Sequence, residues 1–153
     1  ERNMRLKVIG EHALFSPELH ALFLNAEELT ALNTGLTVTV AVNYGGRADI
    51  LTAAQRYYAA HPQQVGQPLD EASFTPYLSM AYAPDPDLFI RTGGETRISN
   101  FLIWQMSYSE LYFTDTLWPD FNRASLLEAM TAFQGRERRF GRISEQLRSS
   151  ADA

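Results

Sequence analysis

Short segments typical of β-strands recur along the chain, and three of them run into glycine. Residues 4–10 alternate long polar with apolar side chains, residues 36–42 are rich in β-branched residues, and residues 88–91 are mostly apolar. Period-two alternation and β-branching both favour the extended conformation. A fourth strand is predicted over residues 110–114, and the low charge of residues 36–42 predicts a central position for that segment.

Apolar residues with helical spacing fill the segments between these strands. Ser16 followed by Pro17 is typical of a helix start, because serine caps the first turn and proline fits within it. The Asn-Thr-Gly sequence at residues 33–35 ends that first helix. The remaining predicted helices cover residues 47–60, 70–82 and 100–108, and a last one begins near residue 123 and continues past 133 into 136–141.

Helices therefore separate the predicted strands from one another. This order is the pattern of βαβ crossovers, which place parallel strands in one sheet with helices on its faces. The sequence predicts an α/β fold with a mostly parallel sheet flanked by helices. We expect one domain over residues 1–143 and a polar tail over residues 144–153. Ligands of such sheets bind beyond the carboxyl ends of the strands, here near residues 45–46 and 93–94.

Composition narrows the class of protein. The 153 residues contain no cysteine and carry a formal net charge of -5. A disulfide framework or a thiolate metal site cannot form without cysteine, which favours a reducing, cytoplasmic location. An acidic balance opposes non-specific binding to nucleic acid, so any anion site has to be local. The apolar runs are strand-sized, and we expect no membrane span.

Arginine, glycine and hydroxyl residues are concentrated in residues 91–100, between a predicted strand and a predicted helix. Arg91 and Arg97 stand on either side of the glycine pair 93–94. Guanidinium groups match phosphate oxygens, and glycines and helix N-termini expose backbone N–H donors. The alternative is an ordinary Gly-Gly turn, with Ser99 as a helix cap and two surface arginines. In an acidic chain, the combination favours an anion site for phosphate groups.

Glu110 opens the fourth predicted strand, and a carboxylate there is a candidate Mg²⁺ ligand. Mg²⁺ takes one or two carboxylates and completes its shell with waters and substrate phosphates. The alternatives are Asp115 as the ligand, or a glutamate at a strand end that simply faces water. The chain contains neither G-x-G-x-x-G nor G-x-x-x-x-G-K-[ST], the motifs of common nucleotide-binding folds.

With these residues in view, the chain resembles the cis-prenyltransferase family, and within it the bacterial undecaprenyl diphosphate synthases. The resemblance covers most of the chain, from about residue 4 to residue 141. It is carried by residues 35–37, 43–47, 87–121 and 136–141, with residues 90–114 as the most specific part. The resemblance implies that the strands predicted here, about four, belong to a larger sheet.

The resemblance also implies roles for the arginine loop and the carboxylate that follows it. Arg91, Arg97 and Ser99, with the backbone of Ile98 between them, would hold the diphosphate of isopentenyl diphosphate. Glu110 would help to hold Mg²⁺ at the same diphosphate.

Two further sites follow from the resemblance alone. Leu36 would lie toward the closed end of the tunnel that receives the growing prenyl chain. Arg139-Phe140-Gly141 is similar to the family's C-terminal Arg-x-Gly motif, which in some members reaches the site of the partner subunit. We therefore expect Arg139 and Gly141 to act at a partner's site.

The chain departs from the family at its beginning. The N-terminal Asp-Gly-Asn-Gly-Arg-Trp motif of the family occurs nowhere in these residues. In the family, its aspartate is the second Mg²⁺ carboxylate, and its loop binds the allylic diphosphate. The chain begins at Glu1 without methionine, so we expect a fragment or the ordered part of a longer protein, inactive by itself. Thr96 and Ala48 stand where histidine and tryptophan are common in the family.

The activity implied is the condensation of isopentenyl diphosphate with an allylic diphosphate such as farnesyl diphosphate. The product would be undecaprenyl diphosphate, a lipid carrier for cell-wall synthesis. A non-catalytic partner subunit of such an enzyme and a diphosphate- or nucleotide-binding module are the two alternatives. We expect Mg²⁺ as cofactor, a homodimer, and contact with the cytoplasmic membrane surface through the lipid product, without insertion and without nucleic acid.

Overall fold

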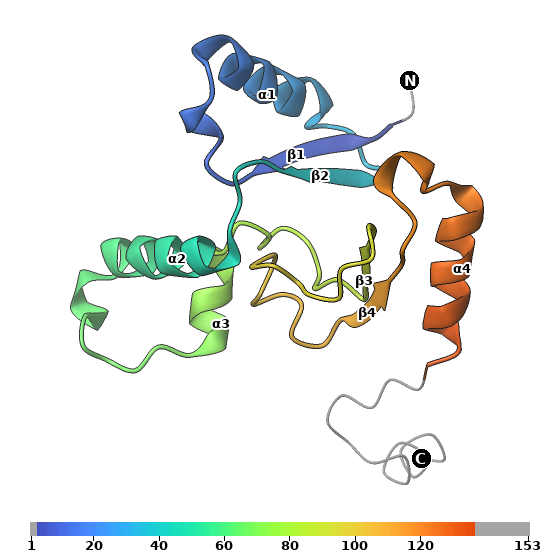
Figure 1. The fold of residues 1–153 in the computed structure, drawn as a ribbon. Coiled ribbons are helices and arrows are strands. Elements are labelled where there is room, and N and C mark those ends of the chain that lie inside the picture. The colour runs from blue at the N-terminus through green and yellow to red at the C-terminus, as the bar shows by residue number, and fades with distance from the viewer. Residues whose placement is uncertain (1–2, 137–153) are drawn as a thin grey trace, which may run out of the picture. The chain divides into compact units, whose positions relative to one another are not determined.

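A computed structural model describes residues 3–136 of the chain (Figure 1). The chain divides into two compact units, Glu1–Pro84 with Asn100–Trp104, and Asp85–Ser99 with Gln105–Ala153. The first unit contains β1 (Arg5–Ile9), α1 (Pro17–Thr30), β2 (Thr37–Ala41), α2 (Gly46–Ala60) and α3 (Glu71–Phe74), with 3-10 turns at His12–Leu14, Pro62–Gln64 and Thr75–Tyr77. The second unit contains β3 (Leu88–Arg91), β4 (Glu110–Phe113), a 3-10 turn at Trp118–Asp120 and α4 (Arg123–Gln134).

In the first unit, β1 and β2 run parallel, and α1 lies beside β1 (Figure 1). Side chains of α1 cover the edge of β1 that faces away from β2. Leu6 N donates to Thr30 Oγ1 at 3.0 Å, and Val8 N donates to Glu27 Oε1 at 3.0 Å. Because an uncovered strand edge presents unpaired backbone donors, these two contacts fix α1 against the strand.

The first helix begins as its sequence predicts. Ser16 Oγ accepts a hydrogen bond from Leu19 N at 3.3 Å, and Pro17 occupies the first turn. The strand that follows is in the predicted segment but not in the predicted position. Within residues 3–136, β2 pairs with β1 alone and most of its side chains are exposed, so a central position is wrong here. A β-branched run reports strand propensity, which does not fix the place of a strand in a sheet.

The core of the first unit lies where α2 packs against α3 and the turn after it. Ala53, Phe74 and Leu78 are buried together. Trp104 packs edge-on against Phe74, with ring centroids 4.8 Å apart. The predicted helix over residues 47–60 is confirmed, and starts one residue earlier.

The helix predicted over residues 70–82 is much shorter than expected. α3 ends at Phe74, and a 3-10 turn over Thr75–Tyr77 follows it. Pro76 lies in that turn. Proline has no backbone N–H, and its ring clashes with a carbonyl of the preceding turn, so the α-helix stops there.

The helix predicted over residues 100–108 does not form, and the segment consists of bends and turns. Asn100 and Leu102 have φ angles of 63° and 40°, in the left-handed region that an α-helix cannot contain. Asn100 instead binds the start of α2. Its carbonyl accepts from Gly46 N at 2.7 Å, and its Oδ1 accepts from Arg47 N at 2.9 Å. These contacts satisfy donors that a helix start leaves free.

This close approach explains why position 46 is a glycine, with no need for a ligand there. A Cβ at position 46 would lie 2.9 Å from Ile103 N and 3.2 Å from Asn100 O. Both neighbours are backbone atoms, which cannot move aside as a flexible side chain could. The glycine therefore allows two backbone segments to pack against each other.

The second unit is built on β3 and β4, which run parallel with Leu88 opposite Glu110 and Arg91 opposite Phe113. Both strands lie where the sequence predicts them. The described strands form two parallel pairs, and helices lie in the connections from β1 to β2 and from β2 to β3, which confirms the α/β fold class. Within residues 3–136, no helix combines the length and the apolar character needed to cross a membrane.

The last described helix, α4, begins at Arg123 as predicted, where Asn122 Oδ1 accepts from Ala124 N at 2.8 Å. It ends at Gln134 with Gly135 as its C-cap, so the predicted continuation into residue 136 is wrong. The predicted tail over residues 144–153 lies outside the described residues, and the single domain over residues 1–143 stays a prediction.

Candidate functional site

The loop after β3 turns sharply at its two glycines. Gly93 and Gly94 have φ angles of 86° and 77°, which side chains other than glycine rarely adopt. Gly93 N donates to Thr116 O at 2.9 Å, and Gly94 N donates to Thr114 O at 2.9 Å. These donors are therefore committed to the segment after β4, contrary to the expectation that they would meet a ligand. The expected helix N-terminus is also absent from this loop, so an anion bound here would have to be held by side chains.

Two arginine side chains of this loop meet at one carboxylate. Arg91 Nη2 and Arg97 Nη2 both contact Glu95 Oε2. Arg91 Nη1 also donates to Ser99 Oγ at 2.7 Å and to Arg97 O at 2.5 Å. The structure thus brings together three of the residues that the sequence singled out, and Ile98 lies between two of them in the chain.

The two guanidinium groups differ in exposure. The Arg91 side chain is 22% exposed, and the Arg97 side chain is 64% exposed. Arg91 is held from several sides at the end of β3, whereas Arg97 extends from the loop toward solvent. A ligand that bound both would meet one fixed and one adjustable positive charge.

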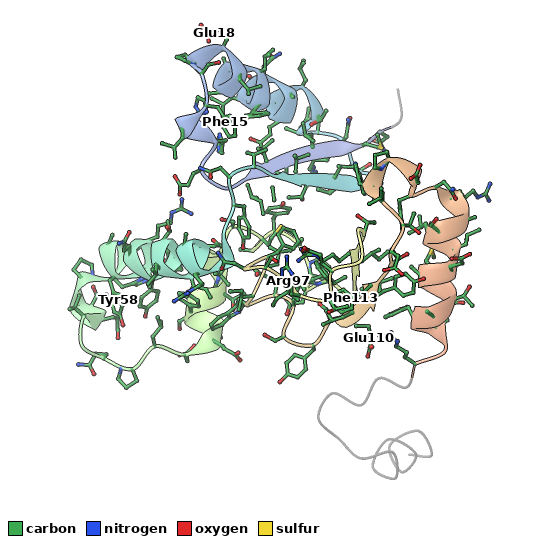
Figure 2. All side chains as sticks on the ribbon, in the orientation of Figure 1. Phe15, Glu18, Tyr58, Arg97, Glu110 and Phe113 are labelled. Carbon is green, nitrogen blue, oxygen red and sulfur yellow. The ribbon has the colours of Figure 1, made fainter. Side chains whose placement is uncertain are left out.

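Glu110 lies at the first position of β4 (Figure 2), as predicted, and it is ion-paired. Arg136 Nη1 donates to Glu110 Oε2 at 2.9 Å and to Leu111 O at 2.9 Å. The alternative ligand, Asp115, lies against the glycine turn, because a Cβ at Gly94 would be 3.0 Å from its Oδ1.

The number and chemistry of the carboxylates decide whether this region suits Mg²⁺. Residues 3–136 contain no group of three or more His, Asp or Glu side chains that could hold a metal ion. Mg²⁺ accepts a single protein carboxylate when phosphate oxygens and waters complete its shell. Glu110 has the carboxylate for one such ligand position, but its oxygen is paired with Arg136, and it lies opposite Leu88, at the other end of the β3–β4 pair from Arg91.

The remaining predicted site residues lie elsewhere. Leu36 belongs to the first unit, immediately before β2, and is 67% exposed. Its carbonyl accepts from Arg5 N at 2.9 Å. Arg139 and Gly141 lie outside the described residues.

Sequence reasoning missed a buried carboxylate in the first unit. Asp49 is 7% exposed and lines a small polar pocket beyond the carboxyl ends of β1 and β2. Its oxygens accept from Tyr44 Oη at 2.8 Å, Ser79 N at 3.0 Å and Ser79 Oγ at 2.8 Å. Burial raises the pKa of the Tyr44 hydroxyl above its ordinary value, and the bond to Asp49 raises it further. Acidic residues are common in the first turn of a helix, where they face solvent. The position of Asp49 in the sequence therefore does not indicate that its carboxylate is buried and hydrogen-bonded.

Comparison with known proteins places this geometry in a family. A family model described as "Putative undecaprenyl diphosphate synthase" matches residues 1–141. The chain belongs to the undecaprenyl diphosphate synthase family. The resemblance inferred from residues 35–37, 43–47, 87–121 and 136–141 is thereby confirmed.

Members of the undecaprenyl diphosphate synthase family with curated names are similar over nearly the whole chain. An isoprenyl transferase from Ralstonia nicotianae is 51% identical over 147 residues, which are 96% of this chain and 57% of the relative. A ditrans,polycis-undecaprenyl-diphosphate synthase from Vibrio cholerae, named as (2E,6E)-farnesyl-diphosphate specific, is 49% identical over 97% of this chain and 60% of its own. The chain thus spans less than two thirds of the length of these relatives.

A solved structure supports the same assignment to the undecaprenyl diphosphate synthase family. The crystal structure of lavandulyl diphosphate synthase from Lavandula x intermedia, in complex with dimethylallyl diphosphate, is 37% identical. It matches with a TM-score of 0.86 over 92% of this chain and 61% of its own. The α/β fold is therefore shared with a prenyl diphosphate synthase.

Proposed function

We propose that this chain forms the part of a cis-prenyltransferase that binds isopentenyl diphosphate. The enzyme would condense isopentenyl diphosphate with an allylic diphosphate such as farnesyl diphosphate and so build undecaprenyl diphosphate. The observation that carries the proposal is the convergence of Arg91 and Arg97 on one carboxylate oxygen. Two positive charges directed at a single anionic position are suited to a diphosphate group.

In this proposal the arginines bind the substrate and fix its orientation. Arg91, held by Ser99 Oγ and by the Arg97 carbonyl, defines the position of one phosphate oxygen. Arg97 adjusts to the rest of the group from its exposed position. Holding the diphosphate in one orientation positions the prenyl carbons for reaction and removes part of the entropy cost of bringing two substrates together.

We further propose that Glu110 holds Mg²⁺ together with the bound diphosphate. The ion would supply positive charge that stabilises negative charge on the diphosphates during the reaction. Glu110 has the hard carboxylate oxygen that Mg²⁺ prefers, and Arg136 would have to release it.

Other predicted features remain part of the proposal. Leu36 would limit the length of the product, and Arg139 and Gly141 would act at a partner's site in a homodimer. The protein would contact the membrane surface through its lipid product.

A chimera tests the proposed activity. The matched 147-residue segment of the Ralstonia nicotianae relative would be replaced by the corresponding residues of this chain. With farnesyl diphosphate and Mg²⁺, the chimera should incorporate labelled isopentenyl diphosphate into polyprenyl lipid. Arg97→Ala in the chimera should lower kcat/KM for isopentenyl diphosphate by about tenfold to a hundredfold, because a charged hydrogen-bond partner is lost.

The matched control is Arg123→Ala, which removes one positive charge from the exposed first turn of α4. This variant should retain the activity of the unmodified chimera. A folded chimera without turnover, or one in which the two arginine variants are equally active, would contradict the proposed function.

A further inference from the structure

The arginine loop already holds an anion that belongs to the chain itself. Glu95 Oε2 contacts Arg91 Nη2 and Arg97 Nη2 at once. A single carboxylate oxygen between two guanidinium groups occupies the position where their positive charges meet. An anion that binds both of these Nη2 groups at the same position would take the place of Glu95.

Arg91 does not depend on Glu95 for its orientation. Its other terminal nitrogen donates to Ser99 Oγ at 2.7 Å and to Arg97 O at 2.5 Å. The side chain of Glu95 is 43% exposed, so it has room to turn toward solvent. The departure of Glu95 would thus leave Arg91 positioned and the anion site open.

We propose that Glu95 is an internal competitor for the diphosphate site. Its carboxylate occupies both arginines until a diphosphate displaces it. This inference rests on the proposed function of the same loop. Because Glu95 is tethered close to the arginines, its effective concentration is on the order of millimolar or higher. An anion that binds weakly therefore cannot displace it, whereas a diphosphate offers several charged oxygens to the two arginines.

The opposite role for Glu95 makes an opposite prediction. If its carboxylate mainly supported the arginines in a binding-competent orientation, removing the charge would let Arg97 move and would weaken diphosphate binding. If Glu95 competes for the arginines, removing the charge strengthens binding. The sign of the change in affinity decides between the two roles.

The experiment measures the affinity of inorganic pyrophosphate for the full 153-residue chain by titration calorimetry at fixed salt. Glu95→Gln should bind roughly threefold to thirtyfold more tightly than the unmodified chain, as expected for the loss of two partly exposed ion pairs. Glu95→Ala should bind more tightly as well, which shows that the new amide is not responsible. Circular dichroism would verify that each variant is folded.

Two further variants complete the test. Glu128→Gln changes the net charge by the same amount from an exposed position on α4, and should leave the affinity unchanged. Arg97→Ala should weaken pyrophosphate binding. If Arg97→Ala weakens binding but both Glu95 variants bind no more tightly than the unmodified chain, the competitor role is wrong while the diphosphate site stands. If Arg97→Ala has no effect, the proposed diphosphate site itself is wrong.

Discussion

Arg136 Nη1 lies 2.9 Å from Glu110 Oε2, so the carboxylate proposed to bind Mg²⁺ is paired with a guanidinium of the same chain. The side chains are 41% and 27% exposed, and an ion pair this exposed contributes at most about 1 kcal/mol. Mg²⁺ can therefore compete with Arg136 for the carboxylate at modest cost.

The first prediction follows from that competition. In the active chimera, Arg136→Gln should lower the Mg²⁺ concentration needed for half-maximal rate, by up to about fivefold. Glu110→Gln should raise it. Rate measurements across a Mg²⁺ series check both, with Arg123→Gln as a control for the loss of a positive charge. An Mg²⁺ requirement that is unaltered by Glu110→Gln would favour a glutamate that only pairs with Arg136.

The second prediction concerns the close approach at Gly46. Gly46→Ala should lower the free energy of unfolding by about 1–3 kcal/mol, because the new Cβ meets backbone atoms of Ile103 and Asn100. Gly135→Ala is the matched control, since its Cβ would have only ordinary contacts at 3.7 Å. Urea denaturation measures both. Equal stability of the two variants would show that this backbone contact does not constrain position 46.

The third prediction is a pH dependence from Tyr44. Its pKa is raised in the folded chain, first by burial and then by the hydrogen bond to Asp49. A raised pKa means that the stability it contributes is complete below the unfolded phenol pKa of about 10 and is lost as pH rises further. The free energy of unfolding should fall between about pH 9 and about pH 11, and Tyr44→Phe should reduce that fall.

Urea denaturation at the two pH values measures the effect. Tyr108→Phe, which removes a phenol that is 69% exposed, serves as the comparison. A fall in stability that is the same in the Tyr44 and Tyr108 variants would contradict the assignment to Tyr44.

The four strands could be predicted because their signals are local. Alternation, β-branching or apolar character over a few residues is sufficient to place them, with a glycine after three of the four, and Ser16-Pro17 marks a helix start in the same way. The prediction of a helix over residues 100–108 was wrong because the structure there depends on a contact that is distant in the sequence. Its apolar spacing is helical, but Asn100 turns away to bind the start of α2, a partner more than 50 positions distant that no local pattern shows.

The site was predictable in part. Arg91 and Arg97 could be expected to converge because they flank a glycine turn at a strand end. The position of the Glu95 carboxylate between the two arginines could not be predicted, because an acidic side chain in a polar loop normally faces water. The pairing of Glu110 with Arg136 joins the first residue of β4 to a residue beyond the end of α4, which spacing in the sequence cannot indicate.

The central claim is that the loop after β3 binds the diphosphate of isopentenyl diphosphate through Arg91 and Arg97. Titration calorimetry of isopentenyl diphosphate with the 153-residue chain tests it most directly. Arg97→Ala should bind about tenfold to a hundredfold more weakly than the unmodified chain, while Arg123→Ala should bind equally well. An Arg97→Ala chain whose affinity equals that of the unmodified chain at the same salt concentration would contradict the account.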